Sequence, residues 1–252
     1  MSNMVFKLWS IWHFLYLVSP FILFLGIYFL VRKRSEKVKY IVGAVMGVIS
    51  IAIIITRNVD IYIRNGWDFE IVPLQVCHLG SVVVGIALLT KNKCLIVTSF
   101  CFHLIPALLA MLFADALANY DTILKIRAQA YIWGHIFIVV GALYGVFVFK
   151  PKCTCRDLLY ALLLVTIFAV VAVVCNSAFR ALLSWEPNYF YLFDYSGTPL
   201  KFLYNVVPTS TYGWFTINWV YTLTLLAVFI GVFVASFFLI RWAIEKLCKQ
   251  SQ

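Results

Sequence analysis

The sequence predicts an all-α protein that crosses a membrane with about seven helices. Hydrophobic residues make up 64% of the 252 residues and charged residues only 12%, which is far more apolar than a soluble core requires. The apolar stretches also repeatedly reach the length of about 20 residues with which an α-helix crosses a bilayer. We expect seven spans, at approximately residues 12–31, 40–56, 71–90, 94–113, 128–149, 158–176 and 218–240.

The first span begins so close to the N-terminus that a signal peptide has to be considered. Its apolar run is long, and no small-residue cleavage site precedes the basic cluster Arg32-Lys33-Arg34, so we expect it to remain as a helix. Short charged segments separate the following spans, until a long loop at 177–217 separates the sixth from the seventh. The aromatic residues of this loop suit the headgroup interface. We treat residues 1–252 as one transmembrane domain.

Basic residues give the expected orientation, because short cytoplasmic loops carry more Lys and Arg than translocated ones. With the N-terminus outside and the C-terminus cytoplasmic, thirteen of the 20 basic residues fall inside and seven of the 10 acidic residues fall outside. Topology and attraction to anionic lipid headgroups then explain the net charge of +10, and no nucleic-acid recognition motif accompanies it. We expect a multi-pass protein of the cell membrane whose partners are membrane lipids and not nucleic acid.

The seven cysteines do not follow the pattern of a disulfide framework, because four lie within or at the ends of apolar spans and one lies in the cytoplasmic tail. The one close pair, Cys153 and Cys155, lies in a basic cytoplasmic turn. A metal site there needs a second pair or a nearby histidine, and the sequence offers neither. Loop thiols, or cysteines acylated beside the membrane, explain the pair better. We expect no metal and no soluble cofactor.

A thiol and an imidazole are expected at matched depth in the outer half of the bilayer. Cys77 lies near the second turn of the third span and His135 near the second turn of the fifth, both roughly 10 Å from the outer face by helix rise. Polar side chains at this depth normally face the bundle interior or a wet cavity, where the two can act as nucleophile and general base. Asn176 ends the sixth span and can reach the same layer as a donor to an oxyanion or to the imidazole.

Spacing alone leaves other assignments open. A free cysteine in an apolar helix often serves as a small packing residue, and a single histidine in a bundle is often only hydrogen-bonded there. His103, midway along the fourth span, competes with His135 as the base. His78 is a further candidate, although it follows Cys77 directly and is turned about 100° from it on a helix.

The segment Pro73-Leu74-Gln75-Val76-Cys77 resembles the P-L-x-x-C signature that opens a spanning helix in the YwaF family of bacterial integral membrane proteins. The likeness continues in family order over about residues 10–240. Gln75 is a departure, since many relatives have histidine there. The further matching elements are Trp133-Gly134-His135, Asn176 and the N-Y-x-Y-L loop motif Asn188-Tyr189-Phe190-Tyr191-Leu192.

The YwaF family is similar to the eukaryotic transmembrane O-acyltransferase that remodels ether phospholipids. By that resemblance Cys77 carries the acyl group as a thioester and His135 acts as the base. The implied function is a lipid acyltransferase or transacylase that moves an acyl chain from a donor lipid to a lysolipid. The residues expected to bind substrate or to orient the reacting groups are Gln75, Asn176, Asn188 and Tyr189.

Three other functions remain open. The same cysteine and histidine hydrolyse lipid esters if water replaces the acceptor hydroxyl. A small-molecule transporter predicts inverted repeats and charges through the membrane depth, and the sequence shows neither convincingly. A non-catalytic membrane scaffold predicts that replacing Cys77 has no effect.

Overall fold

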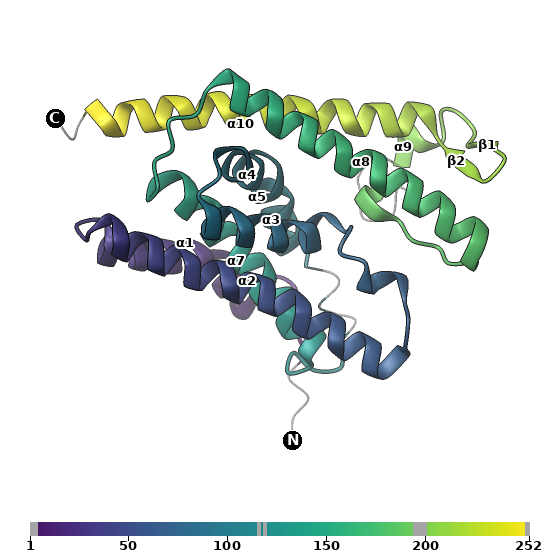
Figure 1. Cartoon of the computed structure of the whole chain (residues 1–252). Coiled ribbons are helices and arrows are strands. Elements are labelled where there is room, and N and C mark those ends of the chain that lie inside the picture. The colour runs from purple at the N-terminus through teal and green to yellow at the C-terminus, as the bar shows by residue number, and fades with distance from the viewer. Residues whose placement is uncertain (1–4, 115–116, 118–119, 194–200, 250–252) are drawn as a thin grey trace.

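The computed structural model describes residues 5–114, 117, 120–193 and 201–249, and it confirms the predicted polytopic helical fold (Figure 1). Within these residues, seven helices or helix pairs are long and apolar enough to cross a membrane. They are Ile11–Val31, Glu36–Asn65, Phe69–Thr90, Lys93–Leu112, Ile126–Phe147, Cys155–Leu183 and Trp219–Lys246.

Short elements interrupt or connect the long helices. The described elements in chain order are α1 (Ile11–Val31), α2 (Glu36–Asn65), η1 (Phe69–Ile71), α3 (Val76–Thr90), α4 (Lys93–Thr98), η2 (Ser99–His103), α5 (Leu104–Leu112), α7 (Ile126–Phe147), α8 (Cys155–Leu183), η3 (Tyr189–Tyr191), α9 (Lys201–Tyr204), β1 (Ser210–Tyr212), β2 (Phe215–Ile217) and α10 (Trp219–Lys249). The two strands form a small antiparallel hairpin in which Thr211 faces Thr216.

Helix α2 is much longer than the expected span at 40–56, because its polar end is stabilised by side-chain contacts. Ser35 caps its start by accepting the N–H of Val38. At the other end Arg64 forms an ion pair with Asp60 one turn earlier, and the helix ends at Gly66, whose φ is 73°. Arg57 therefore lies on a helix and not in an outer loop.

The third span does not begin as a continuous helix at residue 71. A 3₁₀ turn, Phe69–Ile71, is followed by an extended stretch, and α3 starts at Val76. Pro73 explains the break, because proline disfavours the helical conformation of the residue before it. Cys77 consequently lies in the first turn of α3, closer to the helix N-terminus than expected.

The fourth span contains a π-helical segment, Ser99–His103, between α4 and α5. Pro106 follows it in α5 and can neither donate a backbone hydrogen bond nor tolerate the carbonyl of Phe102 in its usual position. The wider π turn accommodates that clash.

The sixth span also continues past its expected end at Asn176. Helix α8 runs to Leu183 and stops at Ser184, which has φ of 53°. Asn176 is therefore a mid-helix residue, and the loop after α8 is shorter than the expected 177–217.

Glycines let α2, α3 and α7 approach one another closely. A Cβ on Gly85 would lie 2.5 Å from Ile51 Cγ1 and 2.9 Å from the Gly47 carbonyl oxygen, and one on Gly141 would lie 2.4 Å from Val84. Such small-residue contacts are a main source of helix association within a bilayer. Figure 1 shows α3, α4 and α5 between the pair α1 and α2 and the pair α8 and α10.

Gly85→Ala is expected to lower the free energy of unfolding by about 1–3 kcal/mol, because the new methyl group has to displace Ile51 or separate α2 from α3. Gly26→Ala on α1 is the matched control, since nothing lies within 4 Å of its Cβ position. Thermal unfolding in detergent micelles measures the difference. Equal unfolding temperatures for the two variants would contradict the close contact between α2 and α3.

Candidate functional site

A cavity of about 180 Å³ lies between α2, α3 and α7, and both Cys77 and His135 line it. The sequence placed these two residues at a common depth, and the structure brings them to a common space. The lining residues are Ile53, Ile54, Arg57, Cys77, His78, Ser81, Tyr120, Arg127, Ala130, Tyr131, Gly134, His135 and Ile138.

One face of α7 forms the longest wall of this cavity. Its lining residues recur at intervals of three and four, as on a single helix face, and run from Arg127 through Tyr131 to Ile138. Gly134 adds no side chain to this wall. The nearest atoms to a Cβ at this position would be Ile53 Cγ2 and Ser81 Oγ, both 3.9 Å away. The cavity thus has room beside His135.

Cys77 is the second residue of α3 and is half-buried. Gln75 is the N-cap residue, and its side chain makes no capping hydrogen bond. The first backbone N–H to find an intrahelical partner is that of Leu79, which donates to the Gln75 carbonyl. The N–H groups before it remain available, and the helix dipole favours an anion at this end.

His135 is held in one defined tautomer. Its Nδ1 lies 2.6 Å from the carbonyl oxygen of Tyr131, and because a carbonyl only accepts, Nδ1 carries the proton. Nε2 then carries the lone pair of a general base. It is buried and has no hydrogen-bond partner among the described residues, Cys77 included.

The remaining histidines differ in their access to the cavity. His78 also lines the cavity, although it is turned about 100° from Cys77 on the helix, because the cavity meets the start of α3. His103 instead donates from Nδ1 to the Val76 carbonyl at 3.1 Å and packs against Gly80. His103 is not among the described residues that line the cavity. This favours His135 over His103 as the base.

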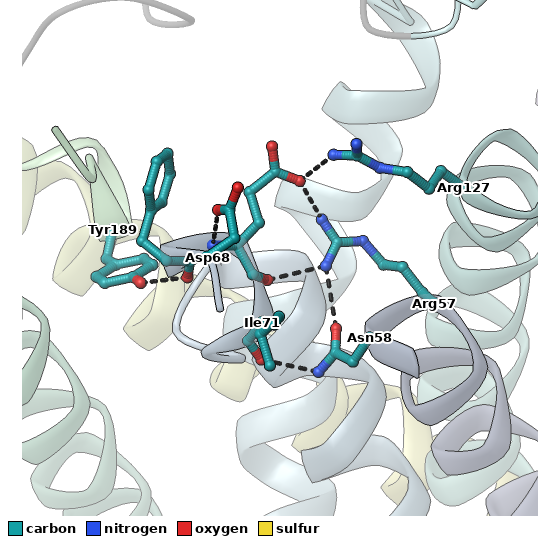
Figure 2. Close-up of polar contacts among 8 residues, drawn as sticks. Arg57, Asn58, Asp68, Ile71, Arg127 and Tyr189 are labelled. Atoms are coloured by element: carbon teal, nitrogen blue, oxygen red, sulfur yellow. Dashed lines mark hydrogen bonds and ion pairs between the residues drawn. The ribbon is translucent and has the colours of Figure 1, made fainter. Parts of the chain in front are cut away.

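Two arginines fix the chain that leads into α3 (Figure 2). The carboxylate of Glu70 accepts a hydrogen bond from Arg57 at 2.8 Å and a second from Arg127 on the same oxygen. Arg57 also donates to the Glu70 carbonyl at 2.9 Å, and Asn58 Nδ2 donates to the Ile71 carbonyl at 2.8 Å. We call this group of five residues the polar clamp. It joins α2 and α7 to the segment immediately before Cys77.

The polar clamp was not predicted from the sequence. Arg57 and Arg127 lie just outside the expected spans, so they were treated only as charged residues of the connecting loops. A signal was present: a carboxylate precedes the third span, while arginines occupy the adjoining ends of the second and fifth. Opposite charges at the same membrane depth pair with one another. That signal predicts a pairing but not which helices are neighbours.

Asn176 binds the loop that joins α8 to α10, which we call the outer loop after its expected side of the membrane, and it does not line the cavity in the described residues. Its carboxamide donates to the Tyr189 carbonyl at 3.0 Å and accepts the Tyr189 N–H at 2.9 Å. The amide nitrogen and the amide oxygen of Asn176 therefore both bind the backbone of Tyr189. The Tyr189 hydroxyl in turn donates to the Phe69 carbonyl at 2.5 Å, next to Glu70. Burial raises the pKa of this phenol, which keeps it a neutral donor.

The other two expected orienting residues, Gln75 and Asn188, make contacts outside the cavity lining in the described residues. Asn188 accepts the N–H of Phe193 at 3.0 Å, and Gln75 caps α3 through its backbone. Within the described part of the chain, none of Gln75, Asn176, Asn188 and Tyr189 lines the cavity. Their contacts position the outer loop and the start of α3.

The outer loop also contains Tyr191, which was not predicted from the sequence to have a role of its own. Phe190 and Tyr191 both adopt left-handed backbone conformations, with φ of 59° and 56°, and such strain often marks a functional site. The Tyr221 hydroxyl holds the Tyr191 carbonyl at 2.8 Å. Burial raises the pKa of the Tyr191 phenol to about 12, which keeps it a neutral hydroxyl.

Fold and site together define a multi-pass α-helical membrane protein with a thiol and an imidazole on one intramembrane cavity. The chain belongs to the TMEM164 family, whose model matches residues 8–240. That range includes the cavity, the polar clamp and the outer loop. No curated protein and no solved structure matches the chain.

Asn176→Ala is expected to lower the free energy of unfolding by about 1–3 kcal/mol, because the Tyr189 N–H loses its partner and the Tyr189 carbonyl keeps only the N–H of Leu192 at 3.4 Å. Thr166→Ala on the same helix is the control, since the Thr166 hydroxyl is exposed and binds only the Leu162 carbonyl of its own turn. Thermal unfolding and limited proteolysis of the outer loop measure the effect. An Asn176→Ala protein as stable and as protease-resistant as the control would contradict this anchoring.

Proposed function

We propose that this protein is a membrane lipid acyltransferase or transacylase in which Cys77 carries the acyl group as a thioester and His135 is the general base. The observation that carries the proposal is the shared cavity: Cys77 and His135 both line it, and Nε2 of His135 has no hydrogen-bond partner among the described residues. Resemblance to the YwaF family and to the eukaryotic ether-phospholipid O-acyltransferase supports the same chemistry.

In the first step, Nε2 of His135 takes the proton of the Cys77 thiol, and the thiolate attacks the ester carbonyl carbon of a donor lipid. No hydrogen bond joins the two side chains in the described structure, so a rotation of the Cys77 side chain or a bound water completes this contact. The free N–H groups of the first turn of α3 stabilise the oxyanion. When the C–O bond breaks, the departing lysolipid oxygen takes the proton from His135.

In the second step, the hydroxyl of an acceptor lysolipid gives its proton to His135 as its oxygen attacks the thioester carbonyl. The C–S bond breaks, the new ester leaves, and the proton returns from His135 to the Cys77 sulfur. Water in place of the lysolipid gives hydrolysis by the same route.

We also propose that the N-terminus is outside the cell membrane and that the cavity serves the outer leaflet. Thirteen of the 20 basic residues lie on the opposite, cytoplasmic side in this orientation, as short cytoplasmic loops require. Donor and acceptor lipids then reach the cavity from the surrounding bilayer.

Intact-protein mass spectrometry after incubation with mixed phospholipids tests the covalent step. A hydroxylamine-labile acyl adduct is expected on the wild-type protein and is expected to be absent from Cys77→Ala. His135→Ala is expected to form it about 10²–10⁴-fold more slowly, because the thiol has lost its base. Added lysolipid is expected to discharge the adduct and to appear as diacyl product.

A Cys153→Ala/Cys155→Ala double variant is the control, since cytoplasmic thiols can carry an unrelated acyl modification. Peptide mapping then locates the adduct. An adduct that persists in Cys77→Ala, or no adduct and no lipid turnover with several donor lipids, would contradict the proposal.

Gly134→Leu is expected to reduce lipid turnover by at least about tenfold while the protein remains folded, because the side chain fills the space beside His135. Gly134→Ala is the matched control: its methyl group would be 3.9 Å from its nearest neighbours, and its turnover is expected to stay close to wild type. Turnover per folded protein is the measurement. Equal turnover in the two variants would place the reaction outside this cavity.

A further inference from the structure

Two positively charged side chains line the cavity. Arg57 and Arg127 both line the cavity, and both bind one oxygen of the single carboxylate of Glu70. The neighbouring acids are engaged elsewhere: Asp68 accepts the Glu70 backbone N–H at 2.8 Å, and Asp60 pairs with Arg64. Two guanidinium groups therefore share one directly bound carboxylate.

The two arginines differ in how many of their donors are used. Arg57 donates to Asn58 Oδ1, to the Glu70 carbonyl and to the Glu70 carboxylate, and its side chain is only 11% exposed. Arg127 binds the Glu70 carboxylate through one terminal nitrogen, and its Nε is buried without a hydrogen-bond partner among the described residues. Arg57 is thus committed to the polar clamp, whereas Arg127 keeps donors for a ligand.

Arg127 lies on the same cavity wall as His135. Eight residues separate them on α7, which corresponds to about 12 Å along the helix axis. The phosphate of a glycerophospholipid and its ester carbonyls are separated by the glycerol backbone alone. One phospholipid can therefore contact Arg127 with its phosphate while an ester group approaches Cys77 and His135.

We propose that Arg127, supported by Arg57, binds the phosphate of a phospholipid in this cavity. The planar guanidinium donates in parallel to two phosphate oxygens, which makes arginine well suited to this group. A phosphate also adds a second anion beside the carboxylate that the two guanidinium groups share, and a neutral glyceride cannot provide one. The cavity then selects phospholipids over diacylglycerols. The function of a lipid so bound, though not its binding, rests on the proposed acyl transfer.

Lipid binding to the full-length Cys77→Ala protein tests the site without turnover. The probes are dioctanoyl phosphatidylcholine and dioctanoylglycerol, each titrated in detergent and followed by native mass spectrometry. Arg127→Gln in the Cys77→Ala protein is expected to weaken phosphatidylcholine binding at least about tenfold. The affinity for dioctanoylglycerol is expected to stay within about twofold of that of Cys77→Ala alone. Lys125→Gln is the matched control, because Lys125 lies two residues away in an exposed ion pair with Asp121. It is expected to change neither affinity.

Unchanged phosphatidylcholine affinity in folded Arg127→Gln would overturn the proposal, as would an equal loss of both lipids. If Arg127→Gln does not fold, Arg127→Lys replaces it: the charge towards Glu70 stays, the planar pair of donors is lost, and about a threefold or greater weakening is expected. Unchanged phosphatidylcholine affinity in Arg127→Lys would also overturn the proposal. Competition by millimolar inorganic phosphate shows whether the site accepts the free anion or requires the lipid. Absence of an acyl adduct on Cys77 would refute acyl transfer but leave these binding results standing.

Discussion

The bridge that Glu70 makes between Arg57 and Arg127 is the interaction on which the position of the thiol depends. Pro73 prevents α3 from continuing backwards, so the chain between η1 and α3 is not held in a continuous α-helix. The bridge supplies that restraint by joining this chain to α2 and α7, the two helices that complete the cavity. Charges at membrane depth are costly when unpaired, and two arginines without the carboxylate would repel each other. The same interaction therefore holds the cavity together and sets its charge.

A second restraint reaches the same chain from the opposite side. Asn176 on α8 holds the backbone of Tyr189, and Tyr189 holds the carbonyl of Phe69 directly before Glu70. The outer loop is thereby coupled to the start of α3, although neither Asn176 nor Asn188 lines the cavity in the described residues. These loop residues act through position, since a displaced loop releases one anchor of the segment that carries Cys77.

The sequence predicted the seven spans because hydropathy and length are local properties that one stretch of chain reveals alone. It misjudged the ends of α2 and α8, where polar or short segments stay helical because of side-chain contacts made after folding. Depth along a helix predicted that Cys77 and His135 share a layer, but not that α3 and α7 are neighbours, which depends on glycine contacts between helices. For the same reason the sequence did not predict that the carboxamide of Asn176 binds the backbone of Tyr189. The catalytic roles of Cys77 and His135 stay predictions.

The central claim is that Glu70 holds a His135-activated thiol at the cavity, and the alkylation rate of Cys77 tests it most directly. N-octyl iodoacetamide in native membranes, followed by peptide mass spectrometry, compares wild type with Glu70→Gln. Asp121→Asn, in an exposed ion pair, is the control. The account predicts at least about tenfold slower labelling of Cys77 in Glu70→Gln, because a small displacement of the thiol from its base is costly. Labelling of Cys77 at the wild-type rate in Glu70→Gln would contradict the account.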